Sequence, residues 1–326
     1  MTVESILVFV PARNEAKTIA GVISTAKAAI YQIAPAARVS VVVIDDGSED
    51  ETGSLAGAEG AIVFRHETSR GLGANFSQAV AYAIHTGADV MVTIDGDGQF
   101  FAEDLPSLLA PVLDGSSDFV TGNRFARGWD IPNMSGVKKM GNHLMSFLVS
   151  SILGRRYRDV SCGFRVYGRE ALLHLNLFGR FTYTQETFLN LGYKSLRLRE
   201  VPIRVQYFPE RRSRIAGNIV RYAWQTLLII VKSLLYYRPL RFLGAVAIIL
   251  VFPSLVSLAV LSVRYLETGL ISPHKGVAIT SLVGVAVGIG IFSLGVVCQI
   301  ISRLQFTADA ILYHERRRSE HYSIHR

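Results

Sequence analysis

The stretch VMVTIDGDGQ, residues 90–99, is the most informative part of this sequence for its fold. Its first half is apolar and rich in β-branched residues, which predicts a buried strand. Its second half places Asp95, Asp97 and Gln99 directly after that strand. Their carboxylate and carboxamide oxygens are ligands that Mg²⁺ or Mn²⁺ prefers, so the stretch indicates a metal site at a strand end. The same residues also fit an Asp/Gly turn that only caps a strand.

Two earlier segments end in the same manner. The apolar residues 39–44 lead into Asp45-Asp46-Gly47-Ser48, and residues 5–10 lead into Pro11-Ala12-Arg13-Asn14-Glu15. With a further strand at 61–65 and helical segments between, this pattern predicts an α/β fold with a mostly parallel sheet, whose ligands gather beyond the carboxyl ends of the strands. The pair Asp45-Asp46 fits a contact to a nucleotide base or ribose, and equally an Asx turn that caps the next helix.

The second half of the chain is too apolar for a water-soluble domain. The mean hydropathy of the whole chain is +0.31. Its second half contains two runs without any charged residue, from Phe242 to Val263 and from Gly276 to Ser302. A membrane-spanning helix needs about 20 apolar residues, so each run predicts one span, and the loop between them completes a hairpin. Three small residues permit close helix contacts and a homo-oligomer through the spans: Gly284, Gly288 and Gly295.

The charge distribution predicts the orientation of that hairpin. The net charge is +8, and the segment from Arg204 to Arg241 holds eight basic residues against the single acid Glu210. Basic residues next to a span mark its cytoplasmic side and bind anionic headgroups. We therefore expect a protein of the cell membrane with its N-terminal domain and both termini in the cytosol. Nucleic acid is a poorer partner, because the spans fix this segment at a bilayer.

The motifs together resemble a known family, the inverting glycosyltransferases of family 2. Within it, the chain is most similar to the subgroup of dolichol-phosphate mannose synthases and bacterial polyprenyl-phosphate glycosyltransferases. The resemblance implies a GT-A type fold and transfer of a sugar from a UDP- or GDP-sugar to a polyprenyl phosphate, with Mg²⁺ or Mn²⁺. It rests on six segments in order: Val10–Glu15, Val43–Ser48, Gly71–Gly73, Asp95–Gln99, Gly122–Arg124 and Ser161–Arg165.

The same resemblance implies roles for individual residues. Asp95, Asp97 and Gln99 would hold the metal, and Asp97 and Arg124 would act at the reacting centre, where Arg124 contacts phosphates. The donor nucleotide would be bound by five residues: Pro11, Arg13, Glu15, Asp46 and Asp95. The chain departs from many relatives at Arg212-Ser213, where they carry a glycine, and at Cys162, where Ser or Thr is more usual.

The acceptor prediction rests on charge. A polyprenyl phosphate is already ionised at neutral pH, so it needs cations to position it and no general base to activate it. Arg211, Arg212 and Arg214 precede a predicted interfacial helix at 215–237, and guanidinium groups suit phosphate oxygens. A solvated basic patch facing the membrane is the alternative. Gln185-Glu186 stands where relatives with hydroxyl acceptors carry an acidic base motif, but it holds only one acid.

These observations divide the chain into four parts. We expect a GT-A domain at 1–210, an interfacial linker at 211–240, two spans within 241–303 at about 242–263 and 276–302, and a cytosolic tail at 304–326. Three other functions fit less of the sequence. They are a family 2 transferase with a hydroxyl acceptor, a catalytically silent membrane scaffold that binds nucleotide sugar, and a small transporter, which the absence of intramembrane ionisable residues disfavours.

Overall fold

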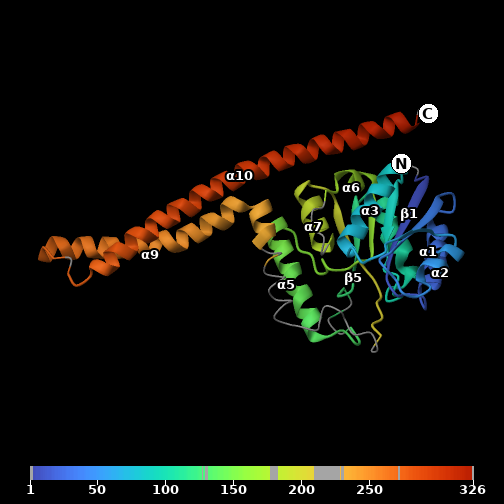
Figure 1. Ribbon diagram of the computed structural model, residues 1–326, viewed down its shortest axis with the longest axis horizontal. Coiled ribbons are helices and arrows are strands. Elements are labelled where there is room, and N and C mark those ends of the chain that lie inside the picture. The colour runs from blue at the N-terminus through green and yellow to red at the C-terminus, as the bar shows by residue number, and fades with distance from the viewer. Residues whose placement is uncertain are drawn as a thin grey trace. The chain divides into compact units, whose positions relative to one another are not determined.

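The computed structural model describes residues 3–126, 128, 131–176, 183–208, 228, 231–270 and 272–324. The chain forms two compact units. One comprises Met1–Tyr222 together with Leu312–Arg326, and the other comprises Ala223–Ile311. The first unit holds the sheet and every motif quoted above that lies within the described residues (Figure 1).

A seven-stranded sheet forms the centre of the first unit, in the order β3-β2-β1-β4-β6-β5-β7. β1, β2, β3 and β4 are parallel neighbours, and β5 and β7 are parallel to each other. β6 runs antiparallel to both β4 and β5. The predicted, mostly parallel α/β sheet is confirmed. The strands are β1 Ser5–Ala12, β2 Arg38–Asp45, β3 Ile62–Arg65, β4 Val90–Thr93, β5 Phe119–Asn123, β6 Arg165–Gly168 and β7 Leu198–Pro202.

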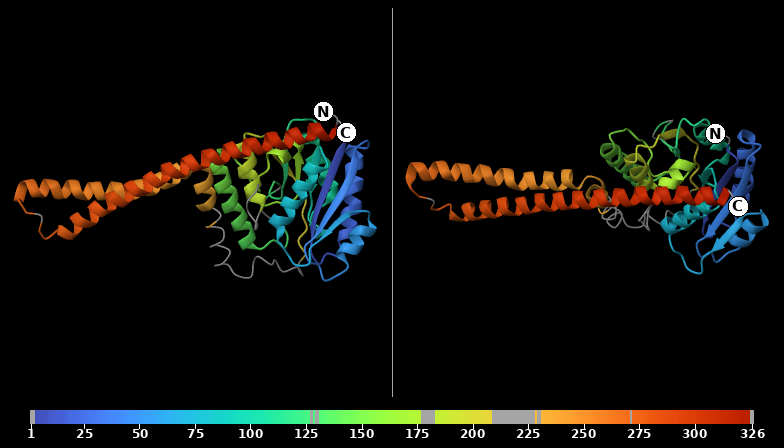
Figure 2. Two further views of the ribbon diagram at one scale, coloured as in Figure 1. Left: turned by 45° about the horizontal axis from the view of Figure 1, so that its top comes forward. Right: turned by 90° about the horizontal axis from the view of Figure 1, so that it is seen from above.

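Helices cover both faces of this sheet (Figure 2). Side chains alternate along a strand, so Ile6 and Val8 of β1 pack in the core with α1 and α4. Phe9 points to the other face, where its ring centroid lies 6.2 Å from that of Phe76 in α3. Covered on both faces, β1 is apolar from Ile6 to Ala12. The helices are α1 Ile19–Ile33, α2 Thr52–Ala58, α3 Leu72–His85, α4 Leu105–Leu113 after the 3₁₀ turn η1 Ala102–Asp104, α5 Gly136–Leu153, α6 Arg169–His174 and α7 Tyr183–Tyr193.

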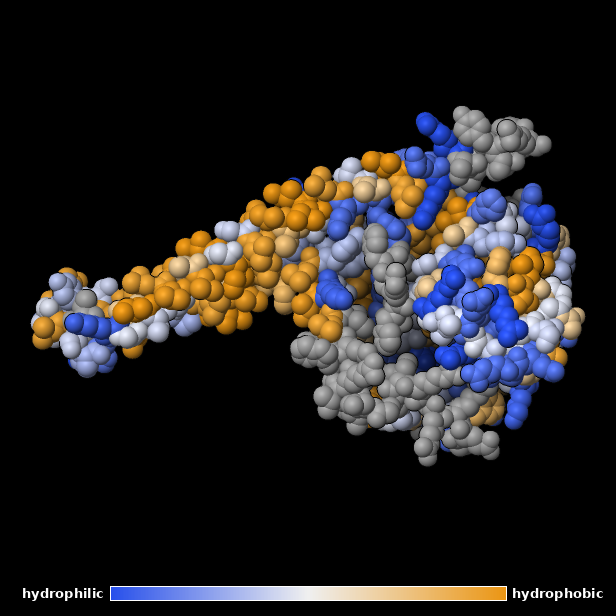
Figure 3. Space-filling view, viewed as in Figure 1, coloured by the Kyte–Doolittle hydropathy of each residue, from blue (hydrophilic) through white to orange (hydrophobic). Residues whose placement is uncertain are grey.

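The second unit contains a hairpin of two helices, each long and apolar enough to cross a membrane. α9 spans Pro239–Thr268, and α10 begins at Lys275 and continues to Ile324. Apolar side chains cover most of the face of this hairpin that Figure 3 shows. Both helices extend beyond the predicted spans, and the segment expected as a separate tail continues α10.

The small residues of the second span serve the hairpin itself. A Cβ atom added to Gly284 would lie 2.3 Å from Ser254 Oγ, and one added to Gly288 would lie 2.3 Å from a methyl of Val251. A Cβ at Gly295 would lie 3.2 Å from Leu243. The three glycines therefore allow α10 to pack closely on α9 of the same chain. They give no support to the predicted homo-oligomer, because the face that they form is already covered.

The last turns of α10 belong to the first unit and pack on α6. The Tyr313 hydroxyl donates to Glu170 Oε2 at 3.0 Å, and its ring stacks on His174 with centroids 4.1 Å apart. Arg316 donates to the backbone carbonyls of Leu173 and Leu175, at 3.0 and 2.6 Å. A cation at these carbonyls satisfies acceptors that the end of a helix leaves without partners. Arg316, the first of three consecutive arginines, is therefore bound to the end of α6.

Candidate functional site

The loops after β1 and β2 are joined by hydrogen bonds at the carboxyl edge of the sheet. The backbone N–H of Asn14 donates to Ser48 Oγ at 3.0 Å, and the N–H of Glu49 donates back to Asn14 Oδ1 at 2.9 Å. The N–H of Glu15 donates to Thr52 Oγ1 at 2.8 Å. Asn14 has a φ of +56°, a left-handed conformation that asparagine tolerates better than most residues. These bonds fix the two predicted donor loops to each other.

Asp46 is the anchor of a third loop at this edge. Its Oδ1 accepts from the Arg70 N–H at 2.8 Å and lies 3.2 Å from His66 Nδ1, while its Oδ2 accepts from Ser69 Oγ at 2.6 Å and from the Gly71 N–H at 3.1 Å. Burial opposes the charged form, but these hydrogen bonds outweigh it and lower the pKa of Asp46 to about 2. The carboxylate thus holds residues 66–71 in place. Its predicted contact with the nucleotide stays a prediction.

The predicted metal ligands follow β4 on a tight turn. Gln99 donates its backbone N–H to Asp97 Oδ1 at 3.0 Å, and the Gly96 N–H donates to the carbonyl of Pro11 at 3.2 Å, which ties this turn to the end of β1. The neighbouring loop approaches from the other side, because a Cβ at Gly163 would lie only 3.0 Å from Asp95 Oδ2. The backbone of Gly163 therefore lies directly against the carboxylate of Asp95, a residue that stays partly exposed.

The charge of Asp95 is poorly compensated. Burial and then the neighbouring carboxylate of Asp97 raise the pKa of Asp95 to about 7, against the opposing effects of Arg124 and Lys138. Two carboxylates that disfavour each other's ionisation are suited to a bound cation, which would remove the repulsion. Among the described residues, no three His, Cys, Asp or Glu side chains gather around one point. Mg²⁺ commonly uses one or two carboxylates together with substrate phosphates, so the pair is sufficient for a metal of this kind.

Arg124 lies at the end of β5 in a buried ion pair that the sequence did not predict. Its Nε and Nη2 each donate to one oxygen of Asp159 at 2.7 Å, and its Nη1 donates to the Tyr207 hydroxyl at 2.7 Å. Asp159 in turn accepts from the Arg124 backbone N–H at 3.0 Å. This bidentate geometry fixes the guanidinium plane and commits three of its five N–H groups. Its predicted contact to phosphates stays a prediction.

Lys138, in the first turn of α5, is a second cation that sequence reasoning missed. Its ammonium lies 4.3 Å from the ring centroid of Tyr207. Burial and the charge of Arg124 lower the pKa of Lys138, whereas Asp97 and Asp95 raise it, so its charge acts on both predicted metal ligands. A lysine in the first turn of a helix carries no recognisable pattern. Asp159 could have been noticed, because it is the only acid between Gly136 and Arg169.

Arg165 holds the segment Ser161–Arg165 in its conformation through hydrogen bonds to backbone carbonyls. Its buried guanidinium donates to the carbonyls of Val160, Cys162 and Thr184 at 2.9, 2.7 and 2.8 Å. Thr93 Oγ1 on β4 donates to the Gly163 carbonyl at 2.6 Å. These bonds shape the loop that carries Asp159 to Arg124 and Gly163 to Asp95.

The other predicted site residues divide into two groups. Pro11, Arg13 and Glu15 lie half-buried at or just beyond the end of β1. The two neighbouring strands are followed by Asp46, after β2, and by Asp95, after β4. The predicted acceptor residues Arg211, Arg212 and Arg214 lie outside the described residues. Most of the predicted interfacial helix does so as well.

Comparison with known proteins agrees with this geometry. The family described as Glycosyl transferase family 2 matches residues 7–175. The chain is 27% identical over 222 residues to UDP-N-acetylglucosamine--dolichyl-phosphate N-acetylglucosaminyltransferase of Methanococcus voltae, across 62% of this chain and 86% of that protein. It is 27% identical over 309 residues to Glycosyltransferase AglJ of Haloferax volcanii, across 93% of this chain and 95% of that protein.

A solved structure shares the fold. Glucosyl-3-phosphoglycerate synthase from Mycobacterium tuberculosis, in complex with Mn²⁺, uridine diphosphate and phosphoglyceric acid, superposes with a TM-score of 0.51 at 22% identity. The match covers 70% of this chain and 78% of that chain.

Proposed function

The chain belongs to glycosyl transferase family 2, and on that premise we propose that it transfers a sugar from a UDP- or GDP-sugar to a polyprenyl phosphate. The Methanococcus voltae relative is named for transfer to a dolichyl phosphate, a lipid acceptor. The two helices able to cross a membrane support an acceptor of that kind, because an enzyme held at a bilayer meets lipid-linked substrates there.

The paired carboxylates after β4 carry the proposal. Asp95 and Asp97, with Gln99, would hold Mg²⁺ or Mn²⁺, which when bound stabilises negative charge on the leaving nucleoside diphosphate. The related solved structure contains Mn²⁺ together with uridine diphosphate. The raised pKa of Asp95 supports this assignment, since the site favours a cation.

The proposed reaction is a single displacement. A phosphate oxygen of the acceptor forms a bond to the anomeric carbon, the bond from that carbon to the diphosphate oxygen breaks, and the diphosphate leaves with the electron pair. The configuration inverts, and no proton needs to move because the acceptor is already ionised. Arg124 and Lys138 supply positive charge near the reacting groups. Arg211, Arg212 and Arg214 are proposed to hold the acceptor phosphate.

The donor nucleotide is proposed to bind along the joined loops after β1 and β2. Pro11, Arg13 and Glu15 would line its pocket, with Asp46 holding the adjacent loop 66–71. We propose that the catalytic domain and both termini lie in the cytosol and that α9 and the first part of α10 form the membrane hairpin. The basic segment between Arg204 and Arg241 supports that orientation.

Transfer from a panel of radiolabelled UDP- and GDP-sugars to polyprenyl phosphate in membranes tests the proposal. We expect lipid-soluble label from one donor, lost on addition of EDTA and in Asp97→Ala. Asp114→Ala is the matched control, because Asp114 is an exposed acid after α4 and should leave transfer unchanged. Lipid-soluble label that persists after metal removal would contradict the proposed function. So would the absence of label with every donor in the panel.

A further inference from the structure

The outer face of α5 carries an apolar stripe. Met140, Leu144 and Phe147 have exposed fractions of 68%, 47% and 64%. Their spacing of four and three residues places them on one side of the helix. The opposite side of α5 is buried through Met145, Val149 and Ile152, so the helix has a normal core face and a second apolar face in solvent. Three large apolar side chains together on one exposed helix face need an explanation.

The sequence of α5 and of the turn after it is basic. One acid of another element approaches this turn, because Glu200 of β7 accepts from the Arg158 backbone N–H at 2.9 Å. From Gly136 to Arg158 the sequence contains no acidic residue and five basic ones. Lys138 lies against the Tyr207 ring on the inner side of α5, which leaves four for the outer surface: Lys139, Arg155, Arg156 and Arg158. The three arginines lie on the turn that follows α5, and each is exposed. An apolar stripe flanked by cations matches the surface of an anionic bilayer, where headgroups carry negative charge above an apolar layer.

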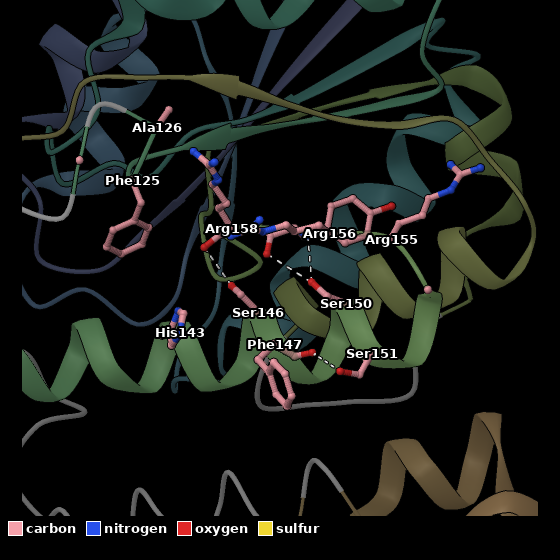
Figure 4. Close-up of a pocket in the computed structure, with 13 residues that line it drawn as sticks. Phe125, Ala126, His143, Ser146, Phe147, Ser150, Ser151, Arg155, Arg156 and Arg158 are labelled. Atoms are coloured by element: carbon pink, nitrogen blue, oxygen red, sulfur yellow. Dashed lines mark hydrogen bonds between the residues drawn. The ribbon is translucent and has the colours of Figure 1, made fainter.

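The turn is fixed to the helix, so stripe and arginines form one rigid surface. Ser146 Oγ donates to the carbonyl of Arg158 at 3.0 Å, and Ser150 Oγ accepts from the Tyr157 N–H at 2.9 Å (Figure 4). A cavity of about 730 Å³ lies between helix and turn, and its lining includes His143 and Phe147 on the helix side and Arg155 and Arg156 on the turn side. The cavity offers room for part of a lipid headgroup beside the stripe.

We propose that this face of α5 docks on an anionic lipid bilayer and orients the catalytic domain there. The turn after α5 leads directly to Asp159, which binds Arg124 at the end of β5, so docking the helix places this edge of the sheet near the bilayer surface. The consequence for catalysis rests on the proposed function, because a lipid-linked acceptor phosphate would be presented at that surface. The docking itself does not depend on which acceptor is used.

Fluorescence of the full-length protein in lipid nanodiscs tests the docking. A polarity-sensitive dye is attached, in a Cys298→Ser background, to Phe147→Cys. The matched control carries it at Tyr31→Cys, since Tyr31 is an aromatic residue of α1 that is 46% exposed. Cys162 is buried and stays. In discs with phosphatidylglycerol we expect a blue shift and quenching by nitroxide lipids at 147 but not at 31, and a smaller effect in phosphatidylcholine. A dye at 147 that reports water in both discs would overturn the proposal. So would one that is already shielded in detergent, because a protein segment would then cover the stripe.

Transfer kinetics with a long-chain and a short-chain acceptor distinguish a loss of membrane orientation from a loss of folded enzyme. Leu144→Glu combined with Phe147→Glu should raise the KM for long-chain polyprenyl phosphate in vesicles about tenfold or more, from the apolar contact that is lost. The KM for the nucleotide sugar and the rate with a short-chain, water-soluble polyprenyl phosphate should stay unchanged, as should both in Tyr31→Glu. An equal loss with both acceptors would contradict an orienting role. If the wild type transfers to neither acceptor, the proposed function fails while the fluorescence result still decides the docking.

Discussion

Two carboxylates at the same edge of the sheet differ in how their charge is compensated. Asp46, after β2, accepts hydrogen bonds from the 66–71 loop, and its pKa is lowered to about 2. Asp95, after β4, lies beside Asp97, and burial and that neighbour raise its pKa to about 7. β1 lies between these strands, so a short distance along one edge separates the two environments. The first carboxylate is satisfied by the protein, and the second is suited to a cation that the protein does not supply.

That difference gives the two sides distinct tasks. The loops after β1 and β2 and the loop 66–71 bond to one another through Asn14, Ser48 and Asp46, and on the proposed function they form a fixed surface for the donor nucleotide. The metal side keeps like charges close together and balances them only in part with Arg124 and Lys138. On the proposed function, the repulsion between Asp95 and Asp97 favours a bound metal and its phosphates.

The largest effect is expected for the buried ion pair next to the metal side. Asp159→Ala should lower the free energy of unfolding by about 3–5 kcal/mol, because Arg124 would be left buried without its carboxylate. Arg197→Ala breaks a surface pair with Asp118, in which the arginine side chain is 58% exposed, and should cost no more than about 1 kcal/mol. Denaturant unfolding measures both. Equal costs would show that the pair does not organise the metal side.

Removing one of the paired carboxylates should act on rate and not on folding. Asp97→Asn should lower the transfer rate about 10²–10³-fold through lost stabilisation of the leaving group. Because the substitution also relieves repulsion with Asp95, the metal-free variant should melt no lower than the wild type. Transfer assays and thermal melts with and without Mn²⁺ check this. A rate unchanged by the substitution would remove Asp97 from the reacting centre.

The two carboxylates should also respond oppositely to pH. Between the ordinary value of 3.8 and about 7, folded Asp95 holds its proton longer than the unfolded chain does, so the metal-free protein should lose stability as pH rises through that window. Mn²⁺ affinity should fall about tenfold per pH unit below 7, since the metal must displace that proton. Asp46 should contribute stability above pH 3.8 that is lost as pH falls toward 2. Thermal melts of Asp95→Asn and Asp46→Asn at several pH values isolate the contribution of each carboxylate to stability. If the two variants showed the same dependence of melting temperature on pH, the contrast between the two carboxylates would be wrong.

The smallest effect is expected on the donor side. Ser69→Ala removes one of the hydrogen bonds to Asp46 and should cost about 1 kcal/mol of stability. It should raise the KM for the nucleotide sugar while leaving the Mn²⁺ dependence unchanged, because the loop 66–71 loosens and the metal side does not. Steady-state kinetics at several Mn²⁺ concentrations measure this. A shift in the Mn²⁺ dependence would mean that the two sides are not independent.

Local patterns in the sequence predicted the strands, the helices and the polar residues at the strand ends. The alternation of apolar strands and helices, and the polar residues at three strand ends, were enough for the parallel part of the sheet and for the position of the Asp95–Gln99 turn. The two apolar runs were enough for the hairpin of two long apolar helices. These features depend on periodicity and composition, which a single sequence displays.

Features that depend on distant partners could not be predicted in this way. Arg124 and Asp159 are 35 residues apart, and their pairing follows from the loop that Arg165 holds through three carbonyls. The antiparallel β6 is too short, at four residues, to reveal its direction. The contact between Tyr313 and Glu170 joins residues 143 positions apart. Gly284 and Gly288 appeared suited to an oligomer because nothing in the sequence shows that α9 of the same chain covers them.

Calorimetric titration of Mn²⁺ into the full-length protein with bound uridine or guanosine diphosphate tests the central claim most directly. We predict one metal site per chain in the wild type and in Asp46→Asn, and none in Asp97→Asn. Metal binding that survives in Asp97→Asn, or that is lost in Asp46→Asn and kept in Asp97→Asn, would contradict the assignment of the metal to the end of β4.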